Sequence, residues 1–276
     1  MTPTVPGLTS LPGSWNQTTR VVKFEFLNYV RSRRFFVLVA INLVISGALT
    51  GLIGYYRPGS LVGSGLAFYS TWWGTSIVFL IALAGVFFGG DAISGEFQSK
   101  TGYFLVVRPV ARSAIYLGKL IAAFLASVII LVLFAGIAVG NGWFYTGPPP
   151  VQFDESVGLA LVYLLAVLGI TFFFSSMFKS SSMSILVTLI LFLFGFTLIQ
   201  AIVTGFAKVE PWFMVTYASA IISNVLSVPY PTHLSPDRGF GSQYVASVPE
   251  GLVIMVVYAL IGAVAGYFLF RRQDFT

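Results

Sequence analysis

Six apolar stretches, each more than twenty residues long, alternate with short polar segments along this sequence. A helix needs about 20 apolar residues to cross the hydrocarbon core of a bilayer, which is about 30 Å thick. Only 9% of the residues are charged, whereas charged residues make up about 25% of an average soluble domain. We therefore expect an all-α integral membrane protein with six transmembrane helices, near residues 35–56, 69–90, 115–140, 156–178, 184–206 and 249–270.

A polar head and an amphipathic stretch precede the first apolar one. Residues 1–17 lack the apolar core of a signal peptide, so we expect a flexible head that is not cleaved. Residues 18–34 have helical spacing, with apolar side chains on one side and most charged side chains, Glu25 among them, on the other. Such a helix lies in the plane of the membrane surface. The sequence thus predicts an interfacial helix that opens a transmembrane domain of residues 18–276.

The basic residues fall mainly on one side of the predicted topology. If both ends of the chain are cytoplasmic, twelve Lys and Arg residues lie on the inner side and three on the outer side. Cytoplasmic loops carry such an excess, so we expect a multi-pass protein of the cell membrane with both termini in the cytoplasm. The inner residues are Arg20, Lys23, Arg31, Arg33, Arg34, Lys100, Arg108, Arg112, Lys119, Lys179, Arg271 and Arg272, and the outer ones are Arg57, Lys208 and Arg238.

Residues 211–228 complicate the count of spans. They carry no charge and are nearly long enough to cross the membrane. A seventh span would place Arg271 and Arg272 outside, against the bias of the other loops. We therefore interpret the stretch as a re-entrant or interfacial helix within an outer segment at residues 207–248.

Several kinds of chemistry lack the residues that they need. The chain has no Cys and a single His, His233, which excludes thiolate and multi-histidine metal sites, and we interpret His233 as a solvated loop residue. A P-loop is also missing, because Gly118 and Lys119 are followed by Leu120 instead of Ser or Thr. The sequence therefore predicts no enzyme and no catalytic, cofactor or metal site. Nucleic acid is not expected as a partner, because the net charge of +6 belongs to the cytoplasmic loops.

The spans hold uncharged polar residues but no charged residue near a predicted midplane. Ion-coupled and proton-coupled carriers usually keep ionisable groups there, so a secondary transporter is disfavoured. Polar side chains in spans either join helices by hydrogen bonds, which we take as the more frequent role, or line a transport pathway. The candidates for the pathway are Asn42, Ser46, Thr75, Thr171 and Gln200.

The most heavily charged stretch after the N-terminal region is residues 90–120, between the second and third spans. Its first part suits a helix that leaves the membrane, and Thr101-Gly102 permits a bend. A short apolar turn then begins at Tyr103 and ends before Pro109. An apolar turn flanked by charges either docks into a partner or rests on lipid headgroups, and the periodicity favours neither.

Four short motifs mark this stretch: Ile93-x-x-Glu96, Lys100-Thr101-Gly102, Arg108-Pro109-Val110-x-Arg112 and Leu117-Gly118-Lys119. Together they resemble the first cytoplasmic loop of ABC-2 type permeases. The rest of the chain is similar as well, in its surface helix, its six spans, its uncharged outer hairpin and its basic C-terminal end. Two departures stand in the loop, where Lys-Thr-Gly replaces the commoner Gly-Thr and Ala111 replaces the usual Ser.

The resemblance implies a transport subunit of an exporter, driven by a separate cytoplasmic ATPase that uses ATP and Mg²⁺. In that family the loop, here residues 91–114, carries a coupling helix, the surface helix packs against it, and two permease chains pair within the lipid as a homodimer or heterodimer. Two other hypotheses stay open, namely a non-transporting anchoring or assembly component and a channel. Carried over residue by residue, the contact with the ATPase would involve Glu96, Lys100, Thr101, Gly102, Tyr103, Phe104 and Arg108.

Overall fold

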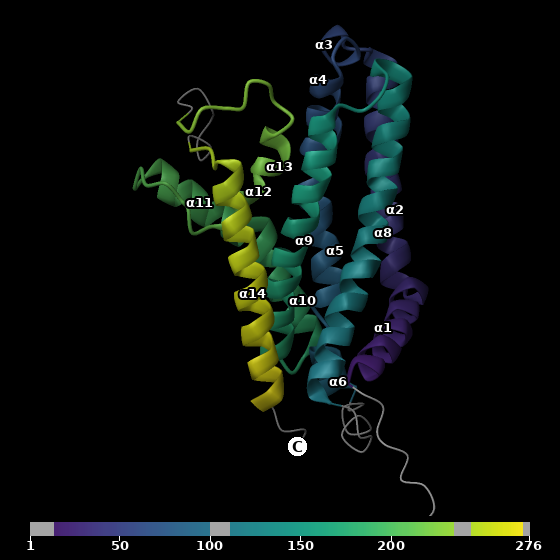
Figure 1. Ribbon diagram of the computed structural model, residues 1–276, viewed down its shortest axis with the longest axis vertical. Helices are drawn as coiled ribbons and strands as arrows, with labels where there is room; N and C mark the ends of the chain where they lie inside the picture. Colours follow the sequence, from purple (N-terminus) through teal and green to yellow (C-terminus); the bar gives the residue numbers. More distant parts are fainter. Residues whose placement is uncertain (1–13, 100–110, 235–243, 273–276) are drawn as a thin grey trace, which may run out of the picture.

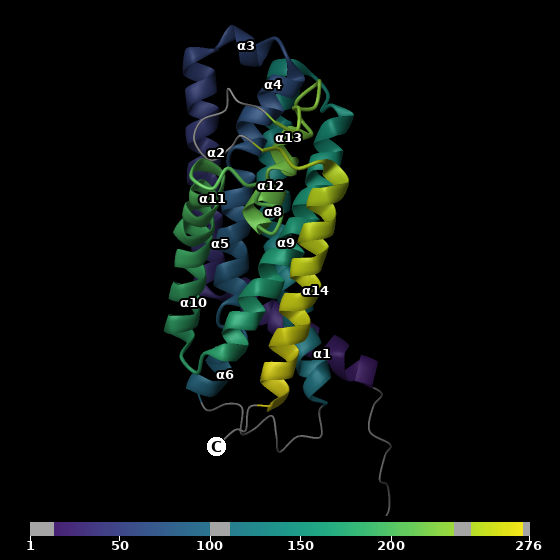
Figure 2. The ribbon, with the colours of Figure 1, turned by 90° about the vertical axis from the view of Figure 1, so that its left-hand side faces the viewer.

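The computed structural model describes residues 14–99, 111–234 and 244–272, and this part of the chain is built from helices. Six of them are long and apolar enough to cross a membrane, and they coincide with the six predicted spans. The spans form one elongated bundle (Figure 1). Helices α1 (Ser14–Arg31) and α6 (Ser94–Gln98) lie at one end, which we call the α6 end, and α3 (Gly59–Val62) lies at the other, the α3 end (Figures 1 and 2).

Four spans are single helices and two contain a π-helical turn. In the second and fifth spans the turns η1 and η2 separate two α-helices, and the second span continues into α6. In chain order the elements are α2 (Arg33–Tyr56); α4 (Gly65–Tyr69), η1 (Ser70–Gly74) and α5 (Ile77–Gly89); α8 (Arg112–Thr146); α9 (Val151–Met177); α10 (Ser181–Ile190), η2 (Leu191–Gly195) and α11 (Phe196–Gly205); and α14 (Val248–Arg272).

Helix α1 precedes the first span and leans against the lower part of α8 (Figure 1). It begins at Ser14, within the stretch expected to be a flexible head, and ends before Ser32. The Ser32 hydroxyl accepts a hydrogen bond of 3.2 Å from the backbone N–H of Phe35 and so caps α2. A Cβ atom at Gly118 would lie 2.6 Å from Val21 Cγ1, so only glycine lets α1 approach α8 this closely.

The second span lies in the centre of the bundle, and its aromatic residues are buried there. Trp72 and Trp73 in η1 are fully enclosed. The Trp72 ring stacks on Phe134 with 4.7 Å between centroids, and Trp73 Nε1 donates a hydrogen bond of 2.9 Å to Ser156 Oγ. These contacts join the second span to α8 and α9, which agrees with the preference of aromatic pairs for offset packing.

Helices α9 and α14 pack closely through glycines. A Cβ atom at Gly262 would lie 2.4 Å from the backbone carbon of Gly169, and one at Gly266 would lie 3.1 Å from the Cα atom of Phe173, both on α9. Small residues four positions apart permit such backbone contact between membrane helices. The sixth span is thereby fixed against the fourth.

The stretch 211–228 does not form a seventh span in the described chain. It folds into α12 (Val215–Ser219) and α13 (Ile221–Asn224), of five and four residues, which are too short to cross a bilayer. Both lie near the upper part of α14, toward the α3 end (Figure 1). Tyr217 and Ile221 are buried, so the short helices fill space inside the bundle.

Candidate functional site

The predicted ATPase contact falls mostly outside the described residues. Glu96 on α6 is described, and it lies at the α6 end of the bundle. Lys100, Thr101, Gly102, Tyr103, Phe104 and Arg108 lie outside the described residues. We call residues 91–114 the predicted coupling segment. The structure gives the geometry of its two ends, at α6 and at the start of α8.

A buried ion cluster links the two ends of this segment. Lys119 on α8 has its Nζ 2.7 Å from Glu25 Oε1 on α1 and 2.8 Å from Glu96 Oε1 on α6. The side chains of Lys119, Glu25 and Glu96 are 5%, 12% and 19% exposed. We call these three residues the Lys119 cluster. Buried charges persist only when they are paired, so the cluster holds α1, α6 and α8 in one arrangement.

A second ion pair extends the network to the first two spans. Arg34 at the start of α2 pairs with Asp91, which follows α5. Tyr29 lies close to both sets of charges, and its ring meets Phe88 edge to face at 5.4 Å. Burial, together with the negative charges of Asp91 and Glu25, raises the pKa of the Tyr29 hydroxyl well above its ordinary value of 10.0. Tyr29 therefore stays neutral among these groups.

A serine on α9 caps α6 from outside. The backbone N–H groups of Ile93 and Ser94 donate to Ser175 Oγ at 2.9 and 3.1 Å. The first N–H groups of a helix have no partner within that helix, and Ile93 offers α6 no side-chain cap. Ser175 supplies the missing acceptor, so the start of α6 is fixed to the fourth span.

Hydrogen bonds from other elements hold the flanks of the segment. Gln17 Oε1 on α1 accepts a hydrogen bond of 3.0 Å from the backbone N–H of Ala111. Arg112 Nη1 donates a hydrogen bond of 2.6 Å to the carbonyl of Arg271 on α14. On the other flank, Gln98 Oε1 accepts a hydrogen bond of 2.8 Å from the backbone N–H of Ser181. Each end of the predicted coupling segment is thus tied to neighbouring helices.

The structure corrects the predicted orientation of Glu25. The sequence pattern put Glu25 on the polar, water-facing side of the surface helix, but its side chain faces α8 and pairs with Lys119. Lys119 had been counted only as an inner basic residue. A signal was present, since Glu25 lies three residues after Val22 and four before Tyr29, on the same side of a helix.

The predicted pathway residues lie in four separate places. Asn42 and Ser46 are together on α2, where Asn42 Nδ2 donates a hydrogen bond of 2.8 Å to the carbonyl of Ile130. Thr75 is exposed between η1 and α5 and donates to the carbonyl of Thr71. Thr171 is buried on α9, where its Oγ1 donates to the carbonyl of Leu168. Gln200 Oε1 on α11 accepts a hydrogen bond of 2.7 Å from Thr216 Oγ1.

One groove on the described part of the chain is apolar. It has a volume of about 650 Å³ and lies between α9, η2, α11 and α14. Phe173, Trp212, Phe213, Val257 and Ile261 are among its lining residues. A surface of this kind suits lipid chains or another apolar helix.

Among the described residues, one group of side chains has donors placed to hold a metal ion. It comprises Glu210, His233 and Glu250. These residues lie on segments near the start of α14, away from the Lys119 cluster. His233 was expected to be a solvated loop residue, because a single histidine cannot form a site with several histidines.

The fold defines an all-α, multi-pass membrane protein with six candidate spans. The sequence model of the family described as ABC-2 family transporter protein matches residues 19–275. The chain therefore belongs to the ABC-2 transporter family, as its loop motifs predict. Members of this family are transmembrane subunits, generally not catalytic themselves, of ABC transporter systems with an ATPase partner. No curated protein sequence matches the chain.

Proposed function

We propose that this chain is the permease subunit of an ATP-driven exporter and couples to a separate ATPase through residues 91–114. The ATPase uses ATP and Mg²⁺, and the permease itself holds no cofactor. Two permease chains, identical or different, pair in the lipid of the cell membrane and form the pathway, with both termini in the cytoplasm. Membership of the ABC-2 family and the loop motifs support this assignment.

The Lys119 cluster is the observation that carries the proposal. The coupling segment leaves α6 and enters α8, and Lys119 joins these two helices to each other and to α1. A force on the segment therefore reaches three helices through paired, buried charges. Coupling between distant sites needs a contiguous physical link of this kind.

The proposed cycle follows from that link. When ATP closes the two ATPase subunits, their movement displaces the coupling segments of both permeases. α6 and α8 transmit the displacement to the second and third spans, and α1 and the Arg34–Asp91 pair transmit it to the first. The two permeases then alternate between inward-open and outward-open arrangements, whose populations ATP shifts.

The distribution of charge supports the orientation. Basic residues gather at the α6 end, in α1, at the start of α2 and α8, and in the last turn of α14. Cytoplasmic segments of membrane proteins carry this excess. We therefore propose that the α6 end faces the cytoplasm, where the ATPase is.

The pairing of polar span residues inside the chain supports a pathway between two chains. Asn42 and Thr171 are fully buried and hydrogen-bonded to backbone carbonyls. The Asn42 bond joins α2 to α8, and the Thr171 bond stays within α9, so both side chains are satisfied inside one permease. We propose that substrate passes along the surface where two permeases meet.

The test is affinity purification of the tagged full chain from its own host. We expect the wild-type chain to retain a Walker-motif ATPase, identified by mass spectrometry. The double variant Tyr103→Asp/Phe104→Asp should retain at least about tenfold less, because charges in an apolar docking pocket remove its anchoring contacts. The assigned docking residues are wrong if both chains retain equal amounts.

A matched control places the same change at the opposite end of the bundle. Tyr55 and Tyr56 at the end of α2 are 83% and 70% exposed. The variant Tyr55→Asp/Tyr56→Asp should retain the ATPase at the wild-type level. Loss in both double variants would indicate general misfolding, which size-exclusion chromatography of each purified chain detects.

A further inference from the structure

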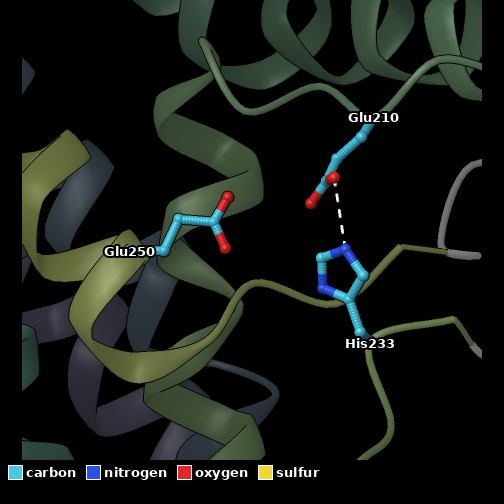
Figure 3. A group of neighbouring side chains, drawn as sticks. All are labelled: Glu210, His233 and Glu250. Carbon is cyan, nitrogen blue, oxygen red and sulfur yellow. Dashed lines mark hydrogen bonds and ion pairs between the residues drawn. The ribbon is translucent and has the colours of Figure 1, made fainter.

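Glu210, His233 and Glu250 bring three donor atoms together near the start of α14 (Figure 3). One ligand atom from each residue lies within 4.8 Å of the other two. The residues come from different segments: Glu210 from the stretch between α11 and α12, His233 from the stretch after α13, and Glu250 from the first turn of α14. No short sequence motif indicates this group, because up to 40 positions separate its members along the chain.

The hydrogen bonds around His233 fix which ring nitrogen faces the carboxylates. His233 Nδ1 lies 3.0 Å from the carbonyl oxygen of Val245. A carbonyl oxygen only accepts, so Nδ1 carries the proton and the neutral ring has its lone pair on Nε2. Histidines that bind metals are usually oriented by such a bond from the other nitrogen.

His233 Nε2, which is an acceptor in the neutral ring, faces a carboxylate oxygen. Glu210 Oε2 lies 3.2 Å from His233 Nε2 (Figure 3), and Glu250 stands on the other side of the same space. Two acceptors at this distance repel each other unless a positive species lies between them. His233 is the one ion-pair partner of Glu210 among the described residues, and Glu250 forms none there.

Both carboxylates are also held by groups outside the cluster. The Tyr217 hydroxyl donates a hydrogen bond to Glu210 Oε1. Ser247 donates to Glu250 Oε2 through its backbone N–H at 3.2 Å and its hydroxyl at 3.5 Å. Each acid therefore has one oxygen held by a neighbour and a second available to a ligand. Supporting bonds of this kind orient metal ligands.

We propose that Glu210, His233 and Glu250 form a binding site for a divalent first-row transition-metal ion, with Zn²⁺ as the preferred ion.

The donor set selects this class of ion. Imidazole nitrogen with carboxylate oxygen suits Zn²⁺ and its neighbours, whereas Mg²⁺ and Ca²⁺ prefer oxygen ligands alone. Zn–N and Zn–O bonds are about 2.0–2.2 Å long, so two ligands of one ion are at most about 4.4 Å apart. The observed limit of 4.8 Å requires only a small closure. The side chain of His233 is 57% exposed, which gives the ion access and leaves a position for water.

The bound ion ties three segments to one another. In its absence, the like charges of Glu210 and Glu250 repel each other across the group. The ion replaces that repulsion with three bonds. Zn²⁺ therefore fixes the segments that flank α12 and α13 to the sixth span.

The test exploits the fact that His233 is the single histidine of the chain. The full-length protein, purified in detergent through a tag without histidine, is treated with diethyl pyrocarbonate, and modification of His233 is followed by mass spectrometry. We expect micromolar Zn²⁺ to slow the modification at least about tenfold, whereas Mg²⁺ at the same concentration leaves it unchanged. Unchanged modification in Zn²⁺ overturns the proposal and indicates that a proton on His233 alone supplies the positive charge.

Isothermal titration with Zn²⁺ provides a second readout. The wild-type chain should bind one ion saturably, and Glu210→Gln, Glu250→Gln and His233→Asn should each weaken that binding at least about tenfold. Glu155→Gln is the matched control, since Glu155 is an exposed acid at the start of α9 outside the group. Tyr217→Phe keeps all three ligands, frees Glu210 Oε1, and should weaken binding by about 10–100-fold. Wild-type affinity in His233→Asn overturns the proposal.

Discussion

Lys119 Nζ lies 2.7 Å from Glu25 Oε1, so the third span is joined to a helix that precedes the first span. The same nitrogen also contacts Glu96, which leads into the predicted coupling segment. One buried lysine thereby determines how the surface helix, α6 and α8 are arranged. Because the two carboxylates depend on it, the cluster is sensitive to changes on any of the three helices.

Replacing Lys119 by methionine should strongly destabilise the protein. Methionine is an unbranched side chain one atom shorter than lysine, and it leaves Glu25 and Glu96 without their shared cation. Removing one partner of a buried ion pair costs about 3–5 kcal/mol. We expect a clear fall in the thermal unfolding temperature of the purified protein in detergent, measured by intrinsic fluorescence. Lys23→Met, an exposed position on α1, is the control and should leave that temperature nearly unchanged.

The destabilisation should be relieved when the carboxylates are also neutralised. The triple variant Lys119→Met/Glu25→Gln/Glu96→Gln removes the uncompensated charges together with the lysine. Neutral replacement of a whole buried ion set is often tolerated. We expect the triple variant to unfold at a higher temperature than Lys119→Met alone. An equal or lower temperature would show that packing around Lys119, and not its charge, stabilises this region.

Ser175→Ala should loosen α6 without preventing assembly. The variant removes the acceptor for the N–H groups of Ile93 and Ser94, and an unsatisfied buried donor costs about 1–3 kcal/mol. We expect faster tryptic cleavage after Lys100, which follows α6 closely, measured on the purified chain by mass spectrometry. Ser127→Ala is the control, because the Ser127 hydroxyl bonds the carbonyl of Ala123 within its own helix. Equal cleavage in both variants would contradict the capping role.

Much of the fold could be predicted from the sequence because the bilayer imposes simple requirements. Length and hydropathy located all six spans, and the charge bias against a seventh span agreed with the short helices α12 and α13. The loop motifs pointed to the family that the sequence model identifies. These features are local, and each depends on a stretch of consecutive residues.

The contacts between distant residues could not be predicted in the same way. Glu25 was placed on the polar face because helical periodicity registers only the character of neighbours on the same helix, and Lys119 lies on another. His233 was read as a solvated residue, which its exposure supports, but the two acids beside it come from other segments. Partnerships of this kind depend on how the helices pack, which a single sequence does not record.

Gly262→Ala should weaken the contact between the fourth and sixth spans. The new Cβ atom would lie 2.4 Å from the backbone carbon of Gly169, and backbone cannot move aside as a flexible side chain can. Overpacking of this kind costs about 1–3 kcal/mol. Gly136→Ala on α8 is the matched control, because a Cβ atom there meets nothing within 4 Å. It should have no cost, since alanine favours a helix over glycine by about 1 kcal/mol. We therefore expect the unfolding temperature to fall in Gly262→Ala and to stay level or rise in Gly136→Ala, and a similar change in both would contradict the close packing of α9 and α14.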